Sequence, residues 1–230
     1  IECGEKEAEN IVLEALFQRL GKSLSRLEYF VPKEEYYEIC LKELILYDIQ
    51  EKEYEFANLF LEEYQWSIEN KNILYHQFAL LLKGLLVYGK QKKIEESLCY
   101  LEKALEMTYK EWKGFSLEKK CLCVQEIQIL LCIYYFRWKK QEVSLEKVID
   151  LLKYMDSYYT DKRERAKILP QCAWLAGNIC EREANYGMAL QLYQAGKTCL
   201  IESGSLGIMD KLLIGERECL QRLNKKEEMK

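Results

Sequence analysis

Residues 173–197 read AWLAGNICEREANYGMALQLYQAGK, and this stretch decides the fold. Gly177 has no side chain, so the helix that carries it can approach a neighbouring helix closely. Asn185 is suited to end a turn and begin a second helix. Ala189 is small enough to lie in the contact, and Tyr193, four residues later, fills the adjoining gap. The spacing therefore predicts two short antiparallel helices packed face to face.

This pattern resembles a tetratricopeptide (TPR) helix pair, and weaker copies of it recur upstream. Each copy places an aromatic or aliphatic residue, a small residue and a bulky residue at fixed helical spacing. The copies are Tyr54/Ala57/Leu61, Ile94/Ser97/Leu101 and Tyr186/Ala189/Tyr193. With Val148 as the contact residue of a further, weaker pair, successive small residues are 40, 51 and 41 positions apart. A regular TPR repeats at about 34 residues, so we expect longer, irregular repeats with extended helices.

The composition predicts an all-α chain. Its 230 residues contain two prolines and eleven glycines, and 49% of them are hydrophobic. Few helix breakers and a large apolar fraction favour helices around a sizeable core. We expect a right-handed TPR-like superhelix of antiparallel helix pairs, an α-solenoid, with a C-terminal capping helix at residues 208–223. A plain bundle of long helices is the alternative, but it does not require the recurring motif.

Helix boundaries follow from apolar periodicity and from capping residues. The expected helices are residues 7–20, a short helix ending at Phe30, 34–48, 53–64, 72–88, a helix carrying Ile94 to Leu105, 116–138, 145–158, 163–183, 186–202 and 208–223. Gly21 and Gly89 are expected to end helices, and Pro170 to start or kink one. In residues 34–48 we expect a helix with Tyr37, Leu41, Leu44, Ile45 and Asp48 along its length.

The opening residues, 1–31, read IECGEKEAENIVLEALFQRLGKSLSRLEYFV and resemble the end of a lambda-repressor-like (Xre-type) helix-turn-helix domain. Ile1, Glu2 and Gly4 match the turn that follows the recognition helix. Leu13, Leu16, Leu20 and Gly21 match the last helix. The proline that often follows the turn in this family is missing here.

Together, the two parts resemble bacterial Xre-type regulators with a TPR-like C-terminal sensor region, such as the Rgg-like and PlcR-like peptide-responsive regulators. Residues 167–190, KILPQCAWLAGNICEREANYGMAL, also resemble a helix pair of that family. The resemblance implies a cytoplasmic, homodimeric transcription factor whose groove receives a short peptide or another small signal. Residues 1–31 would then end the helix-turn-helix domain and add a linker helix, and residues 32–230 would form the sensor and dimerisation domain.

The net charge, the hydropathy and the cysteine pattern limit which partners, such as DNA, membranes or metals, the chain is expected to bind. A net charge of −4 disfavours direct DNA binding, so we expect DNA contact only through residues that precede Ile1. No apolar run reaches the ~18 residues that a membrane helix needs, which predicts no membrane partner. The ten cysteines contain no CxxC pair. We therefore expect reduced, buried thiols in the cytoplasm, with no metal and no cofactor.

The sequence also predicts that the chain is not an enzyme. It has no phosphate-binding glycine loop, and its single histidine, His76, lies in an apolar helix start, where a partly buried structural role is expected. The paired glutamates at 34–35, 62–63 and 95–96 are expected at helix starts or on polar faces, where solvation and the helix dipole explain them.

Candidate ligand-binding residues are those that the helical register places on the concave wall, which the first helix of each pair forms. Asn178 is the sharpest candidate, because asparagine has poor helix propensity and its amide offers both a donor and an acceptor. A solvated polar role is equally open for Asn178, and a core role for Trp174. The full set is Gln171, Trp174, Asn178, Glu181, Arg182, Arg137, Gln128, Gln50 and Lys42.

Two other functions stay open at this point. The first is a stand-alone TPR adaptor that docks a protein partner and has no link to DNA. The second is a phosphatase-like TPR protein of the Rap group, although the N-terminal bundle carrying an active glutamine has no clear counterpart in the sequence.

Overall fold

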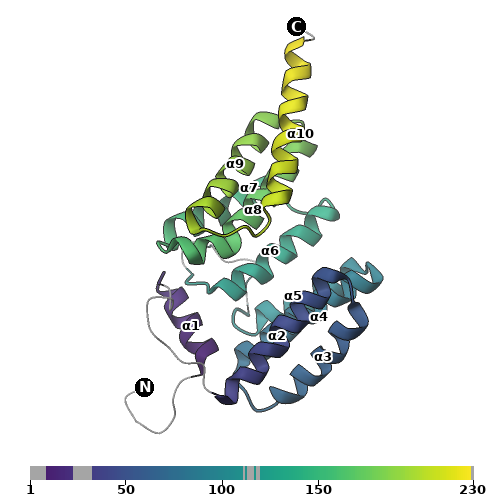
Figure 1. The fold of residues 1–230 in the computed structure, drawn as a ribbon, viewed down its shortest axis with the longest axis vertical. Coiled ribbons are helices and arrows are strands. Elements are labelled where there is room, and N and C mark those ends of the chain that lie inside the picture. Colours follow the sequence, from purple (N-terminus) through teal and green to yellow (C-terminus); the bar gives the residue numbers. More distant parts are fainter. Residues whose placement is uncertain (1–8, 23–32, 111, 113–116, 118–119, 229–230) are drawn as a thin grey trace. The chain divides into compact units, whose positions relative to one another are not determined.

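The computed structural model describes residues 9–22, 33–110, 112, 117 and 120–228, and within them no strand occurs (Figure 1). The helices are α1 (Asn10–Arg19), α2 (Lys33–Glu51), α3 (Tyr54–Ser67), α4 (Ile73–Gln91), α5 (Ile94–Glu106), α6 (Val124–Lys139), α7 (Leu145–Tyr158), α8 (Lys162–Arg182), α9 (Tyr186–Ser203) and α10 (Met209–Glu228). The all-α prediction is confirmed, and the arrangement is compatible with an α-solenoid. None of these helices is both long enough and apolar enough to cross a membrane.

The chain divides into two compact units. The N-terminal unit comprises residues 1–17 and 24–115, and the C-terminal unit comprises residues 18–23 and 116–230. The boundary near residue 115 falls inside the range 32–230 that the sequence pattern assigned to one repeat region. The expected helix-turn-helix turn at Ile1, Glu2 and Gly4 lies outside the described residues, as does the short helix expected to end at Phe30.

In the N-terminal unit, α2 packs on α3, α3 on α4 and α4 on α5. The small residues that the motif singles out, Ala57 and Ser97, are fully buried, as predicted. Gly89 does not end a helix, so that prediction is wrong. It lies inside α4, where an added Cβ would be 2.4 Å from Cε1 of Tyr54. The helix ends instead at Lys92, which has a left-handed φ of 57°.

In the C-terminal unit, the α8–α9 pair has the predicted packing. The ring of Tyr193, 1% exposed, lies against Gly177, where an added Cβ would be 2.4 Å from Cε1. On its other edge the ring meets Gly215 of α10, where an added Cβ would be 2.5 Å from Cε2. Asn185 caps α9 by accepting a hydrogen bond from the Met188 amide at 3.3 Å. The buried ring of Tyr193 is thus packed between Gly177 of α8 and Gly215 of α10.

One of the remaining helices of this unit differs from the expectation. The helix expected from Ser116 begins at Val124, and Ser116 lies outside the described residues. Pro170, predicted to start or kink a helix, does not start one and lies buried inside α8. The bounds predicted for α7 are confirmed, and its contact residue Val148 is fully buried. Both α6 and α7 pack on α8 more closely than on each other.

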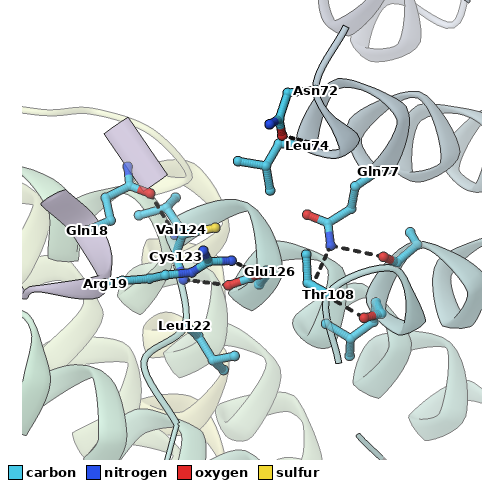
Figure 2. Close-up of polar contacts among 12 residues, drawn as sticks. Gln18, Arg19, Asn72, Leu74, Gln77, Thr108, Leu122, Cys123, Val124 and Glu126 are labelled. Carbon is cyan, nitrogen blue, oxygen red and sulfur yellow. Dashed lines mark hydrogen bonds and ion pairs between the residues drawn. The ribbon is translucent and has the colours of Figure 1, made fainter. Parts of the chain in front are cut away.

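The last turn of α1 is anchored within the C-terminal unit (Figure 2). Oε1 of Gln18 accepts a hydrogen bond from the Val124 amide at 2.8 Å, and its Nε2 donates to Glu164 of α8 at 3.0 Å. Arg19 pairs with the fully buried Glu126 at 2.5 Å. The other carboxylate oxygen of Glu126 accepts the Cys123 amide at 2.7 Å, so both oxygens are bonded. Gly21 ends the turn as predicted.

Two expectations about single residue types need correction. Glu35 lies at a helix start, in the first turn of α2, as expected, but it is not solvated: it is buried and accepts the Asn10 main-chain N–H at 3.0 Å. The burial expected for the cysteines applies to Cys123, Cys172, Cys180 and Cys219, whereas Cys99 and Cys121 are exposed. All nine cysteines within the described residues are free thiols, and no cluster of three metal-ligating side chains occurs in that part of the chain.

Candidate ligand-binding site

A polar pocket of about 590 Å³ lies within the C-terminal unit, at the C-terminal end of α8. Helices α8 and α10 supply most of its wall. Its lining residues are Asn178, Glu181, Arg182, Tyr186, Glu218, Gln221 and Arg222. Apart from the tyrosine, every lining side chain carries a charge or an amide. The pocket is therefore suited to a polar ligand rather than to an apolar one.

Helical spacing explains why these side chains converge. On α8 the residues at 178, 181 and 182 share one face, because residues three and four apart are neighbours on a helix. The residues at 218, 221 and 222 do the same on α10. Both helices approach Tyr193 through a glycine, Gly177 on α8 and Gly215 on α10. The glycine contact thus sets the separation of the two pocket walls.

Glu181 is held in place by two donors from the core. Its Oε1 accepts a hydrogen bond from the Tyr193 hydroxyl at 2.6 Å and one from the Cys219 thiol at 3.5 Å. Burial and, to a smaller extent, the Glu181 carboxylate raise the pKa of Cys219 to about 12. Burial likewise raises the pKa of Tyr193. Both donors therefore stay protonated near neutral pH and fix the carboxylate at the pocket wall.

Asn178 has a local reason to sit in the middle of a helix. Its Nδ2 donates to the main-chain carbonyl of Trp174, one turn earlier, at 2.7 Å. Such a bond offsets part of the poor helix propensity of asparagine. The Oδ1 atom of this half-buried side chain is then the acceptor that Asn178 presents to a ligand.

The two arginines carry the positive charge of the pocket. Arg182 and Arg222 are both exposed. Among the described residues, neither has a carboxylate within ion-pair distance. With Glu181 and Glu218, the lining holds two positive and two negative side chains. A ligand that bears both a carboxylate and an N–H donor matches this arrangement.

Aromatic side chains extend the same face beyond the pocket. The Trp174 ring lies 6.2 Å from the Tyr135 ring of α6, and Nζ of Lys211 on α10 is 5.4 Å from it. Tyr135 in turn lies 6.0 Å from Trp138. Trp174 is half-buried, so it both packs against its neighbours and keeps an accessible edge. This row gives a ligand an aromatic surface next to the polar pocket.

The predicted site residues fall into three groups. Asn178, Glu181 and Arg182 line the pocket, and Trp174 lies one turn away from it. Gln171 is exposed on α8 and donates to the Lys167 carbonyl at 3.2 Å, while Gln128 and Arg137 are half-buried on α6. Lys42 and Gln50 lie on α2, in the other unit.

Lys42 occupies an interior position rather than an open wall. Its Nζ lies 4.3 Å from the centre of the Phe78 ring, and burial lowers its pKa. The sequence reasoning also missed the α10 wall, Glu218, Gln221 and Arg222. Their spacing of three and four residues places these side chains on one helical face, which is the pattern that could have predicted them. The prediction that this helix is a C-terminal cap gave it no part in the ligand-binding wall.

A second hollow, of about 550 Å³, lies among α7, α8 and α9. Leucine, isoleucine and alanine side chains line much of it. It includes none of the predicted site residues. The polar pocket is therefore the stronger candidate for the predicted ligand.

Comparisons with protein-family models, curated proteins and solved structures give no match to this chain.

Proposed function

We propose that this chain is the ligand-sensing and dimerisation region of a bacterial Xre-type transcriptional regulator, and that the polar pocket takes a short peptide. The observation that carries the proposal is the convergence of Asn178, Arg182, Gln221 and Arg222 on one pocket between α8 and α10. The DNA-binding part of the proposal rests on the resemblance of residues 1–31 to the end of a helix-turn-helix domain.

The pocket chemistry fits the groups of a peptide. The amides of Asn178 and Gln221 each offer a donor and an acceptor, as a peptide unit does. Arg182 and Arg222 match a carboxylate, because a guanidinium presents paired N–H donors to it. The anchored Glu181 accepts from a ligand N–H. An apolar ligand side chain would lie along Trp174.

The same unit offers a route from the pocket to the N-terminal segment. Helix α8 carries pocket residues at its C-terminal end and Glu164 in its first turn, where Glu164 accepts a hydrogen bond from Gln18. A ligand that draws α8 and α10 together would shift α8 and with it the anchor of α1. In this proposal, that shift changes how an upstream DNA-binding head is held in a homodimer.

The binding step is tested by probing an array of random heptapeptides with the chain and with the double variant Asn178→Ala/Arg182→Ala. We expect peptides that bind the wild type to lose at least tenfold in affinity with the variant. Arg163→Ala is the matched control, because Arg163 is exposed on the same helix and does not line the pocket. An equal loss in the control, or unchanged binding by the double variant, would refute the site.

The regulatory step needs a separate experiment. Genome-wide DNA occupancy of the epitope-tagged natural gene product should show discrete sites that change when a selected peptide is supplied. A protein that occupies no DNA sites but still binds peptides through Arg182 would instead be the alternative, a stand-alone adaptor that docks a protein partner.

A further inference from the structure

The outer faces of α2 and α3 expose an unusual number of large apolar side chains. On α2, Tyr37 and Leu44 are exposed, whereas Leu41 and Ile45 are buried. On α3, Trp66 is 79% exposed. The exposed set, here called the aromatic face, consists of Tyr36, Tyr37, Leu44, Tyr47, Phe56, Leu59 and Trp66.

These side chains form one surface within the N-terminal unit. On α2 the positions 36, 40, 44 and 47 follow helical spacing, and on α3 the positions 56, 59, 63 and 66 do the same. The two helices pack against each other. A hydrogen bond from the Tyr37 hydroxyl to the Glu63 carboxylate crosses between them on this face. The two stripes are therefore adjacent.

The area of the aromatic face is large for a surface that stays in water. Five aromatic side chains, each about half to four-fifths exposed, present roughly 600 Å² of surface, given that an aromatic side chain buries 150–250 Å². The largest apolar patch on a typical monomer is about 300–600 Å² and is often functional. One side of a standard protein interface buries about 800 Å². The aromatic face is thus at the upper end of what a typical monomer exposes and corresponds to about three-quarters of one side of a standard interface.

The charged residues around the aromatic face indicate what kind of partner it would bind. Among the residues of α2 and α3 whose side chains the structure describes, every exposed charged side chain is a glutamate: Glu43, Glu51, Glu55, Glu62 and Glu63. Lys42 is half-buried over the Phe78 ring, and the exposed Lys52 lies in the turn between the two helices. Glu55 already pairs with Lys90 of α4 at 2.6 Å, but Glu43 and Glu51 flank the α2 stripe. A second copy of this face would bring glutamates against glutamates.

We propose that the aromatic face docks an amphipathic, positively charged segment of another protein. Its apolar side chains would cover Tyr47, Phe56 and Trp66, which are the residue types that anchor interfaces. Its Lys or Arg side chains would pair with Glu43 and Glu51 and would also lie over the exposed rings, which attract cations. This surface lies on the N-terminal unit and does not depend on the pocket of α8 and α10.

The test uses a synthetic 18-residue amphipathic helix of leucine and lysine, with a leucine and glutamate helix of the same pattern as the control peptide. Affinity is measured by calorimetry. We expect at least tenfold weaker binding with Trp66→Ser/Phe56→Ser and about fivefold weaker binding with Glu43→Gln/Glu51→Gln. All four residues are exposed, so circular dichroism should show that both variants keep the wild-type fold.

Matched controls separate this site from general attraction between opposite charges. Glu106→Gln/Glu146→Gln removes two exposed glutamates from α5 and α7, and Ile201→Ser removes a 65% exposed isoleucine from α9. Each should change the affinity by less than twofold. Losses equal to those of the face variants would overturn the proposal, as would equal binding of the leucine and glutamate helix.

Two other occupants give results that also overturn the proposal. If sedimentation shows self-association that Trp66→Ser abolishes, the face pairs with a second copy. If acrylamide quenches the wild type and Trp66→Phe equally, Trp66 is covered by another part of the chain. The proposal requires that Trp66 is quenched in the free protein and protected by the lysine peptide.

Discussion

Replacing Gly177 with alanine should destabilise the C-terminal unit, although alanine is the better helix former. The new Cβ would lie 2.4 Å from Cε1 and 2.6 Å from Cζ of Tyr193. Relief to an ordinary contact requires a movement of about 1 Å. The ring cannot retreat freely, because Gly215 lies against its other edge, and movement also strains its hydrogen bond to Glu181.

The magnitude follows from opposing contributions. Alanine gains about 1 kcal/mol of helix propensity over glycine. Overpacking a close contact costs about 1–3 kcal/mol, and weakening a hydrogen bond to a carboxylate costs about 1.5–3 kcal/mol. These contributions bracket a net loss of about 1.5–5 kcal/mol, and because the hydrogen bond is weakened rather than lost, we expect about 2 kcal/mol in the free energy of unfolding. For a chain of this size, that loss lowers the Tm by about 4–8 °C.

The measurement is urea unfolding followed by circular dichroism at 222 nm, with thermal unfolding as a second readout. Gly187→Ala is the matched control: it lies in the first turn of α9, and an added Cβ there meets nothing within 4 Å. It should be neutral or stabilise by up to about 1 kcal/mol. In a Tyr193→Leu background, Gly177→Ala should lower the free energy of unfolding by less than it does in the wild type. A Gly177→Ala protein as stable as the wild type would refute the packing argument.

Three further substitutions test other parts of the structure by urea unfolding. Gln77→Leu should cost about 2 kcal/mol, because this fully buried amide donates to α5 and its neighbouring turn (Figure 2), and an unchanged midpoint would contradict that role. Glu126→Gln should cost about 2 kcal/mol by breaking the ion pair with Arg19, and the loss should vanish in an Arg19→Gln background. Lys197 holds the pKa of Glu216 below its usual range, so Glu216 stabilises the fold above its unfolded pKa of about 4.3. That stabilisation is lost as pH falls through the lower folded pKa, and the gap between wild type and Glu216→Gln should close toward pH 3.

The helix pair of α8 and α9 could be predicted because its decisive contacts involve residues of unusual size. With glycine at 177, alanine at 189 and tyrosine at 193, the two helices can pack closely in few ways. In the structure Tyr193 packs against Gly177 and Ala189 is buried, as predicted. Gly89 shows the limit of the same logic. A glycine near the end of an apolar run is equally typical of a helix end and of a close contact between helices. At Gly89 it is a close contact, with Tyr54, which lies 35 positions away in the sequence.

The surface features were harder to predict. Tyr37 and Leu44 have the spacing of a buried stripe, but which side of an apolar helix is covered depends on neighbours that one helix does not encode. On α10, Gln221 and Arg222 are polar residues of the kind that any solvated helix carries. Their convergence with Asn178 depends on how α8 and α10 pack around one tyrosine, which is a tertiary property.

The uneven exposure of the cysteines makes the chain suitable for selective labelling. Thiolates react with maleimides, so burial that raises the pKa of Cys132 and Cys219 to about 12 and of Cys180 to about 11 protects these thiols. Cys99 and Cys121 are exposed, and they belong to different units. With the thiol at position 3 replaced by serine, a fluorescent donor and acceptor on these two sites would report the distance between the units. The same dye pair would show whether a bound peptide changes that distance.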